Sequence, residues 1–156
     1  PLIKGEEYNL TAVGDGEGGL LGPVMMKKLA LTDKGKAWAG ISIADETLEQ
    51  AAAALARSIR WRGPLELEVM RDQQGRYQLI EINPRFPAWI YLSHGVGRNL
   101  PALLLKLAAG EPPEDYGPPR VGMLFIRYAQ EAIVPLQAFE GVIMQGSRRH
   151  DPAEQP

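Results

Sequence analysis

Apolar and polar residues alternate along the first part of the chain. Tyr8, Leu10 and Ala12 are separated by single polar residues, which predicts a β-strand over residues 6–13, because alternate side chains of a strand share a face. Gly-containing stretches predict turns over residues 14–23 and 32–35. The apolar runs that follow them predict strands over residues 24–31 and 37–44. We therefore expect three consecutive strands in an antiparallel meander.

The apolar spacing then changes from that of a strand to that of a helix. Asp45 is a suitable N-cap for a helix that ends at about Arg60, before the Gly-Pro pair at 63–64. Apolar side chains follow the cap at helical intervals, at Leu48, Ala51, Ala52, Leu55 and Ile59. A second helix is predicted over residues 99–109 from three boundary signals, namely the cap Asn99, Pro101 in the first turn and Gly110 beyond the end.

Between the two helices, residues 65–71 and 76–83 predict a β-hairpin whose loop is residues 72–75. A four-residue loop sets the expected register, in which the facing pairs are Arg71 and Arg76, Glu68 and Leu79, and Glu66 and Glu81. One face of the hairpin then carries Glu66, Glu68, Glu81 and Asn83, and the other carries Leu65, Leu67, Val69, Ile80 and Ile82. A slip of one residue would destroy this arrangement, so the site depends on the register.

The polar face of this hairpin carries candidate metal ligands. Glu81 and Asn83 are two residues apart and share a face, and Glu68 lies on the partner strand. Oxygen ligands of this kind suit a hard cation such as Mg²⁺ or Mn²⁺. A solvated acidic surface is the alternative, but facing carboxylates without a cation would repel each other. Arg85 follows the strand and suits an anion such as phosphate, or else an ordinary ion pair with one of the glutamates.

Lys27 and Lys28 interrupt the apolar strand at 24–31, and they face opposite sides because they are adjacent. Either one could contact phosphate, and a lysine at the sheet edge with its charge in water is the alternative. The run from Gly14 to Gly19 matches the glycine fingerprint of dinucleotide sites, but no helix follows it, so we interpret it as a loop between strands.

The rest of the chain adds sheet to the same unit. Residues 111–120 are a Pro-rich connector, two short strands are expected at 121–129 and 132–136, and residues 147–156 are expected to be a disordered tail. The expected fold class is α+β, with a mostly antiparallel sheet and helices packed on one face. We expect one domain, with its main lobe over 1–111 and its connector and extra strands over 112–146.

Composition narrows the classes of partner. The chain has 156 residues, with 17 Lys and Arg against 19 Asp and Glu, so no net charge favours nucleic acid or an anionic membrane. Cysteine is absent, which excludes disulfides and thiolate sites and favours the cytoplasm.

The chain begins at Pro1 without an initiator Met, which a piece cut from a longer protein explains better than a natural terminus. The oligomeric state stays open, including a homo-oligomer.

Four stretches together resemble the C-terminal lobe of the ATP-grasp superfamily, over roughly residues 4–111. The start Gly5-Glu6-Glu7-Tyr8-Asn9 resembles the strand after the hinge between the lobes of that family. The segments from Gly63 to Val69 and from Gly75 to Phe86, which contain Glu-Ile-Asn-Pro-Arg, resemble the metal-binding hairpin of carbamoyl-phosphate synthetase-like and D-alanine ligase-like members. Residues 97–111 resemble the helix that follows.

The resemblance implies roles for individual residues. Glu68, Glu81 and Asn83 would bind Mg²⁺, and Arg85 would contact the transferred phosphate. Glu6 or Glu7 would lie near the ribose of ATP, and Lys27 or Lys28 near its phosphates. Glu66 has no role that carries over from the family.

The activity implied is ATP-dependent ligation of a small carboxylate to an amine, or less often a thiol, through an acyl-phosphate. The N-terminal lobe of the family is missing from the chain, so this piece should be inactive or nearly so by itself. Three alternatives are left open: a bicarbonate- or carbamate-phosphorylating enzyme like carbamoyl-phosphate synthetase, a non-catalytic nucleotide-binding module, and a naturally separate subunit that supplies half of a site.

Overall fold

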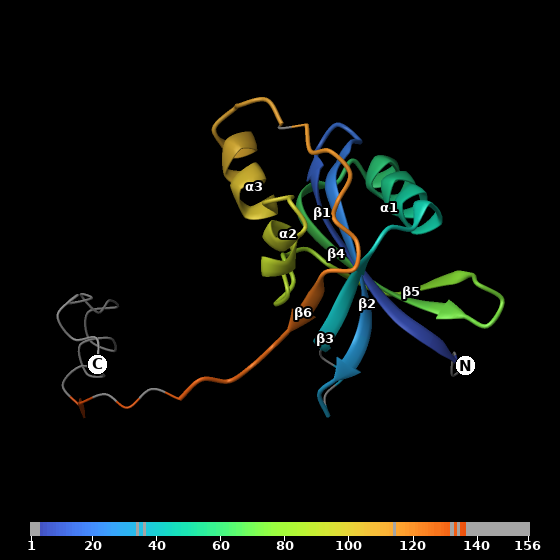
Figure 1. Cartoon of the computed structure of the whole chain (residues 1–156). Coiled ribbons are helices and arrows are strands. Elements are labelled where there is room, and N and C mark those ends of the chain that lie inside the picture. Colours follow the sequence, from blue (N-terminus) through green and yellow to red (C-terminus); the bar gives the residue numbers. More distant parts are fainter. Residues whose placement is uncertain are drawn as a thin grey trace.

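A computed structural model describes residues 4–33, 35, 37–113, 115–131, 133, 135 and 136. Its centre is a six-stranded sheet in the order β5-β4-β1-β2-β3-β6, in which all neighbours are antiparallel (Figure 1). The strands are β1 (Gly5–Asp15), β2 (Leu20–Leu31), β3 (Ala37–Ile43), β4 (Arg62–Asp72), β5 (Tyr77–Asn83) and β6 (Leu124–Ile126). The meander and the hairpin are confirmed, although β2 begins earlier than the sequence predicts.

In the described part of the chain, three helices accompany the sheet: α1 (Glu46–Ile59), α2 (Tyr91–Gly95) and α3 (Leu100–Ala108). The two predicted caps form, because the side chain of Asp45 accepts a hydrogen bond from the Leu48 amide and that of Asn99 accepts one from the Ala102 amide. The sequence did not predict α2, which has five residues and no side-chain cap. A helix of little more than one turn is too short to show a helical period.

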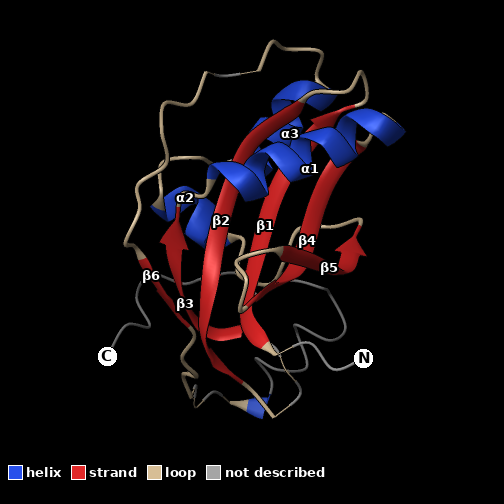
Figure 2. Ribbon diagram, turned by 90° about the vertical axis from the view of Figure 1, so that its right-hand side faces the viewer, coloured by secondary structure: helices blue, strands red, loops and turns tan. Residues whose placement is uncertain are grey.

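The helices divide between the two faces of the sheet (Figure 2). On one face, α1 packs its buried Leu48 and Ala52 against Leu10 and Leu67. On the other, α2 and α3 form a second core with the inner strands, and its buried members include Val24, Met26, Trp89, Leu92, Leu100 and Leu103. The α+β class is therefore confirmed, but the expectation of helices on a single face is corrected. Burial of apolar side chains on both faces of β2 requires cover on both sides.

The register between β4 and β5 differs from the one that the sequence predicts. Glu66 pairs with Asn83 and Glu68 pairs with Glu81, whereas beyond a bulge Val69 pairs with Leu79. Ile80 is the extra residue between these pairs and is 54% exposed, so its predicted place on the apolar face is wrong. At the site the shift amounts to two residues, which keeps every carboxylate on its predicted face because strand side chains repeat every two residues.

The C-terminal strand is shorter than the predicted 121–129, and the residues before it bond to the side chain of Ser42 as well as to its backbone. The Ser42 hydroxyl donates to the Arg120 carbonyl at 2.9 Å and accepts from the Met123 amide at 2.9 Å. The predicted strand at 132–136 lies partly outside the described residues, and Ile133 and Pro135 are not in a strand. The predicted tail at 147–156 lies wholly outside them.

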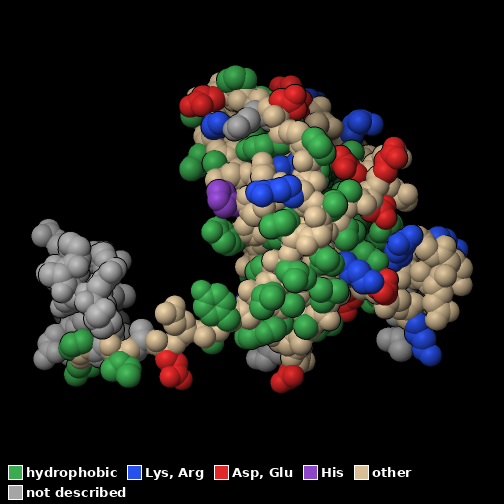
Figure 3. Space-filling view, in the orientation of Figure 1, with side chains coloured by type: hydrophobic (Ala, Val, Ile, Leu, Met, Phe, Trp, Pro, Cys, Tyr) green, Lys and Arg blue, Asp and Glu red, His purple; other side chains and the backbone are tan. Residues whose placement is uncertain are grey.

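The edge at β6 leaves apolar side chains in contact with solvent. Trp38, Leu124 and Ile126 are 41%, 59% and 60% exposed. Figure 3, in the orientation of Figure 1, shows hydrophobic side chains gathered where β3 and β6 lie. Within the described residues, no helix is both long and apolar enough to cross a membrane.

Candidate nucleotide and metal site

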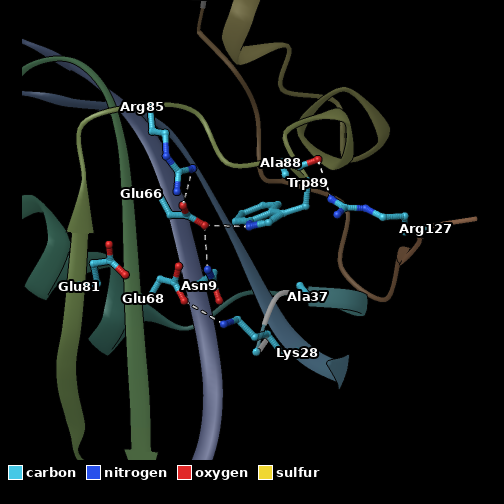
Figure 4. Close-up of a pocket in the computed structure, with 11 residues that line it drawn as sticks. Asn9, Lys28, Ala37, Glu66, Glu68, Glu81, Arg85, Ala88, Trp89 and Arg127 are labelled. Atoms are coloured by element: carbon cyan, nitrogen blue, oxygen red, sulfur yellow. Dashed lines mark hydrogen bonds and ion pairs between the residues drawn. The ribbon is translucent and has the colours of Figure 1, made fainter. Parts of the chain in front are cut away.

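A cleft of about 440 Å³ lies on the sheet face that α2 and α3 partly cover (Figure 4). It is lined by residues of five neighbouring strands, of the turn before β3 and of the segments after β5 and β6: Asn9, Lys28, Gly35, Ala37, Glu66, Glu68, Glu81, Arg85, Ala88, Trp89 and Arg127. The predicted residues Lys28, Glu68, Glu81 and Arg85 therefore meet in one place.

The predicted metal ligands lie next to one another across the β4–β5 pair. Glu68 is directly opposite Glu81, and Asn83 follows two residues later, opposite Glu66. Among the described residues, no group of three or more His, Cys, Asp or Glu side chains is placed to hold a metal ion. Mg²⁺ commonly takes one or two carboxylates and completes its shell with water and substrate phosphates. Two facing carboxylates and a neighbouring amide oxygen fit a cation that arrives with a nucleotide.

The structure distinguishes between the two adjacent lysines. The Nζ atom of Lys28 lies 2.8 Å from Glu7 Oε2 and 2.9 Å from Glu68 Oε2, and only 5% of the Lys28 side chain is exposed. Burial by itself lowers the pKa of Lys28, but the hydrogen bonds to Glu7 and Glu68 outweigh it, so the pKa is raised and the ammonium stays charged. Lys28 therefore brings a fixed positive charge to the cleft.

Lys27 and Glu6 lie on the opposite face of the sheet. They form an ion pair with each other, 2.5 Å between Lys27 Nζ and Glu6 Oε1, and Lys27 lies over the ring of Tyr8, which belongs to the core under α1. The structure thus places Lys28 and Glu7, but neither Lys27 nor Glu6, towards the cleft. Local sequence could not decide this, because only the strand register fixes which lysine shares a face with Glu68.

Glu66 is a buried carboxylate to which the sequence assigned no role. Its Oε1 accepts from Asn9 Nδ2 at 2.9 Å and from Trp89 Nε1 at 3.1 Å. Its Oε2 accepts from Arg85 Nη1 at 3.2 Å and from Asn83 Nδ2 at 3.4 Å. Burial raises the pKa of Glu66, and the hydrogen bonds from Asn9 and Trp89 oppose that shift.

Arg85 lies where the sequence predicts, at the end of β5 beside the acidic residues. It contacts Glu66 and the Phe86 carbonyl, while 57% of its side chain remains exposed. Both interpretations of this residue are therefore compatible with its position, since one nitrogen of the guanidinium contacts the buried Glu66 and the exposed part of the side chain is available to an anion.

Two lining residues, Trp89 and Arg127, were not among the site residues that the sequence predicts. Trp89 is 3% exposed and donates its indole N–H to Glu66, which places a ring along one wall of the cleft. Arg127 follows β6 and donates to the Ala88 carbonyl at 3.2 Å. A contact between residues 39 positions apart along the chain has no local signal in the sequence.

Sequence comparison identifies the family. A family model described as ATP-grasp in the biosynthetic pathway with Ter operon matches residues 1–131. No curated protein matches the chain.

Solved structures share the fold at low identity. Biotin carboxylase from Campylobacter jejuni matches with a TM-score of 0.65 and 18% identity, over 79% of this chain and 29% of that one. The ATPase subunit of phosphoribosylaminoimidazole carboxylase from Aquifex aeolicus matches with a TM-score of 0.68 and 14% identity, over 91% and 46%. L-amino acid ligase from Bacillus licheniformis matches with a TM-score of 0.52 and 19% identity, over 67% and 29%.

The present chain therefore spans less than half of the length of each of these proteins. The antiparallel sheet and its hairpin with facing glutamates are the features by which the sequence resembles the ATP-grasp superfamily, and the family model matches the same part of the chain. The chain belongs to the ATP-grasp family of the biosynthetic pathway with the Ter operon.

Proposed function

We propose that this chain is the ATP- and Mg²⁺-binding half of an ATP-dependent ligase, and that a second ATP-grasp lobe completes the site. The observation that carries the proposal is the meeting of Glu68, Glu81, Lys28 and Arg85 around one cleft. Carboxylates that suit a metal ion and basic side chains within one cleft suit the triphosphate of a nucleotide, whose charge a metal and basic side chains must share. By itself the chain is expected to show little or no turnover.

Within this proposal, Mg²⁺ or Mn²⁺ would be held by Glu68, Glu81 and Asn83. The metal would neutralise charge on the phosphates and orient the group being transferred. Lys28 would exchange one of its carboxylate contacts for a phosphate oxygen, and Glu7 on the same face would lie nearer the ribose. Arg85, which is half exposed, would contact the transferred phosphate.

The proposed reaction joins a small carboxylate to an amine, or to a thiol. A carboxylate oxygen of the substrate attacks the γ-phosphorus, the bond from that phosphorus to the ADP oxygen breaks, and an acyl-phosphate forms. The amine then attacks the acyl carbon, inorganic phosphate leaves, and the amine loses a proton. This route requires no nucleophilic side chain, only positive charge where the phosphate transfers. Phosphorylation of bicarbonate or carbamate uses the same groups and is the alternative reaction.

Titration of the chain with Mn²⁺ in the presence of ADP tests the metal site. Glu81→Ala and Glu68→Ala should each weaken Mn²⁺ binding at least about tenfold, because each removes a charged oxygen ligand. Glu46→Ala, an exposed glutamate at the start of α1 on the other face, is the control and should bind as wild type. Unchanged Mn²⁺ affinity in both site variants would show that the facing glutamates do not bind the metal.

A further inference from the structure

Asn9 lies at the centre of the sheet beneath the cleft and is only 2% exposed. It pairs with Glu68 on β4 and with Met26 on β2, so its side chain projects from the same face as the proposed metal ligands. A polar residue here interrupts the strongly buried stretch of β1. Buried polar atoms normally have hydrogen-bond partners, so each atom of this amide requires an explanation.

The two ends of the Asn9 amide differ. Its Nδ2 donates to Glu66 Oε1 at 2.9 Å, whereas its Oδ1 is buried and has no hydrogen-bond partner in the described part of the chain. Exchanging the two ends would set the amide oxygen against a carboxylate oxygen, which is repulsive, so Glu66 fixes the orientation. Figure 4 shows the oxygen turned away from Glu66, on the side of Lys28 and Glu68.

Glu66 is suited to this orienting role and to no other in the cleft. Its two oxygens receive four donors: Asn9 and Trp89 at Oε1, and Asn83 and Arg85 at Oε2. A carboxylate offers about four lone-pair positions, so all of them are occupied. Glu66 therefore has no free position for a metal ion or for a substrate proton, but it holds two amides and a guanidinium from different elements.

We infer that Asn9 supplies a further oxygen ligand to the cation held by Glu68 and Glu81, and that Glu66 is the positioning residue that turns this oxygen towards the cleft. The inference rests on the proposed function, because it concerns the same metal. An amide oxygen is a hard, neutral ligand that adds coordination without adding negative charge. Glu66 holds Asn83 through the same kind of contact, so one buried carboxylate orients both amides.

The experiment measures the affinity of the chain for Mn²⁺ in the presence of ADP by electron paramagnetic resonance, together with the thermal midpoint of each variant. Asn9→Ala should weaken Mn²⁺ binding about tenfold, and Glu66→Gln by about 10- to 100-fold, the range typical of residues that orient metal ligands. In Glu66→Gln, an N–H₂ group replaces one carboxylate oxygen and cannot accept the hydrogen bonds made there. The Asn9 or Asn83 amide that loses its acceptor can then rotate and turn its oxygen away from the cleft.

Thr11→Val is the matched control. Thr11 lies two residues further along β1 on the same face, and its buried hydroxyl donates to the Leu65 carbonyl at 2.9 Å rather than to the cleft. This variant should lose thermal stability but keep the wild-type Mn²⁺ affinity. The comparison separates loss of a buried hydrogen bond from loss of a ligand.

Wild-type Mn²⁺ affinity in folded Asn9→Ala overturns the inference, and so does wild-type affinity in folded Glu66→Gln. If Glu66→Gln does not fold, Asn9→Ala decides by itself. Failure of the proposed function looks different, because the wild-type chain would then bind no Mn²⁺ at all. Binding by the wild type with unaltered binding by Asn9→Ala rejects only the role of Asn9.

Discussion

Lys28→Met in the intact protein should lower MgATP-dependent phosphate release by about 10²- to 10³-fold, the usual cost of removing one preorganised group that stabilises transferring charge. The same substitution should leave Mn²⁺ affinity equal or higher, because Glu68 would lose the ammonium that competes with a metal for its oxygen at 2.9 Å. Met retains most of the apolar stem of lysine, so the wall of the cleft should be preserved.

The control for this prediction is Lys27→Met, the adjacent lysine on the other face of β2. Its partner Glu6 is away from the cleft, and both groups are at the protein surface. Phosphate release by Lys27→Met should therefore remain within about twofold of wild type, as for a surface substitution that costs little stability. Equal losses in the two variants would contradict the assignment of Lys28 to the phosphates.

Arg98→Met should lower the free energy of unfolding by about 3 kcal/mol, because two carbonyl groups lose a charged donor. Arg98 is only 8% exposed, and its guanidinium donates to the Pro23 carbonyl and, at 3.0 and 3.3 Å, to the Gly117 carbonyl. Burial lowers the pKa of Arg98, and the charge of Glu49 opposes the shift. The side chain thus joins the turn before α3 to the start of β2 and to the connector.

Urea unfolding of Arg98→Met measures this effect, with Arg120→Met as the comparison. The Arg120 side chain is exposed, and the described contacts of that residue are made by its backbone, so its replacement should cost less than about 0.5 kcal/mol. Similar unfolding free energies in the two variants would show that the buried guanidinium does not hold the connector. Mn²⁺ binding should persist in Arg98→Met, because Arg98 does not line the cleft.

Much of the candidate site could be predicted from the sequence because its residues follow the two-residue period of strands. Glu66, Glu68, Glu81 and Asn83 share one face as expected, even though the pairing differs from the prediction. The pairing of β4 with β5 is offset by one residue near the turn, and the bulge at Ile80 adds a second residue to the offset at the site. An offset of two residues leaves each side chain on its predicted face. The helix caps at Asp45 and Asn99 were similarly local and were predicted correctly.

The remaining features depend on contacts that local patterns do not encode. The choice between Lys27 and Lys28 required the register of β1 against both β2 and β4. The role of Glu66 required Trp89 and Asn9, which approach it from 23 and 57 positions away. The second helical layer depended on α2, which is too short for a helical period, and on buried Met25 and Met26, which face opposite cores.

The proposed function requires Glu81 to hold the metal of an ATP-consuming enzyme. Phosphate release by the intact protein, measured with MgATP across a panel of small carboxylates, amines and thiols, tests it most directly. The wild type should release phosphate when substrate and acceptor are present, and Glu81→Gln, which keeps the shape but removes the charge, should retain no more than about 1% of that rate. Wild-type release by Glu81→Gln, or stable nucleotide binding by the wild type without turnover over the whole panel, would contradict it.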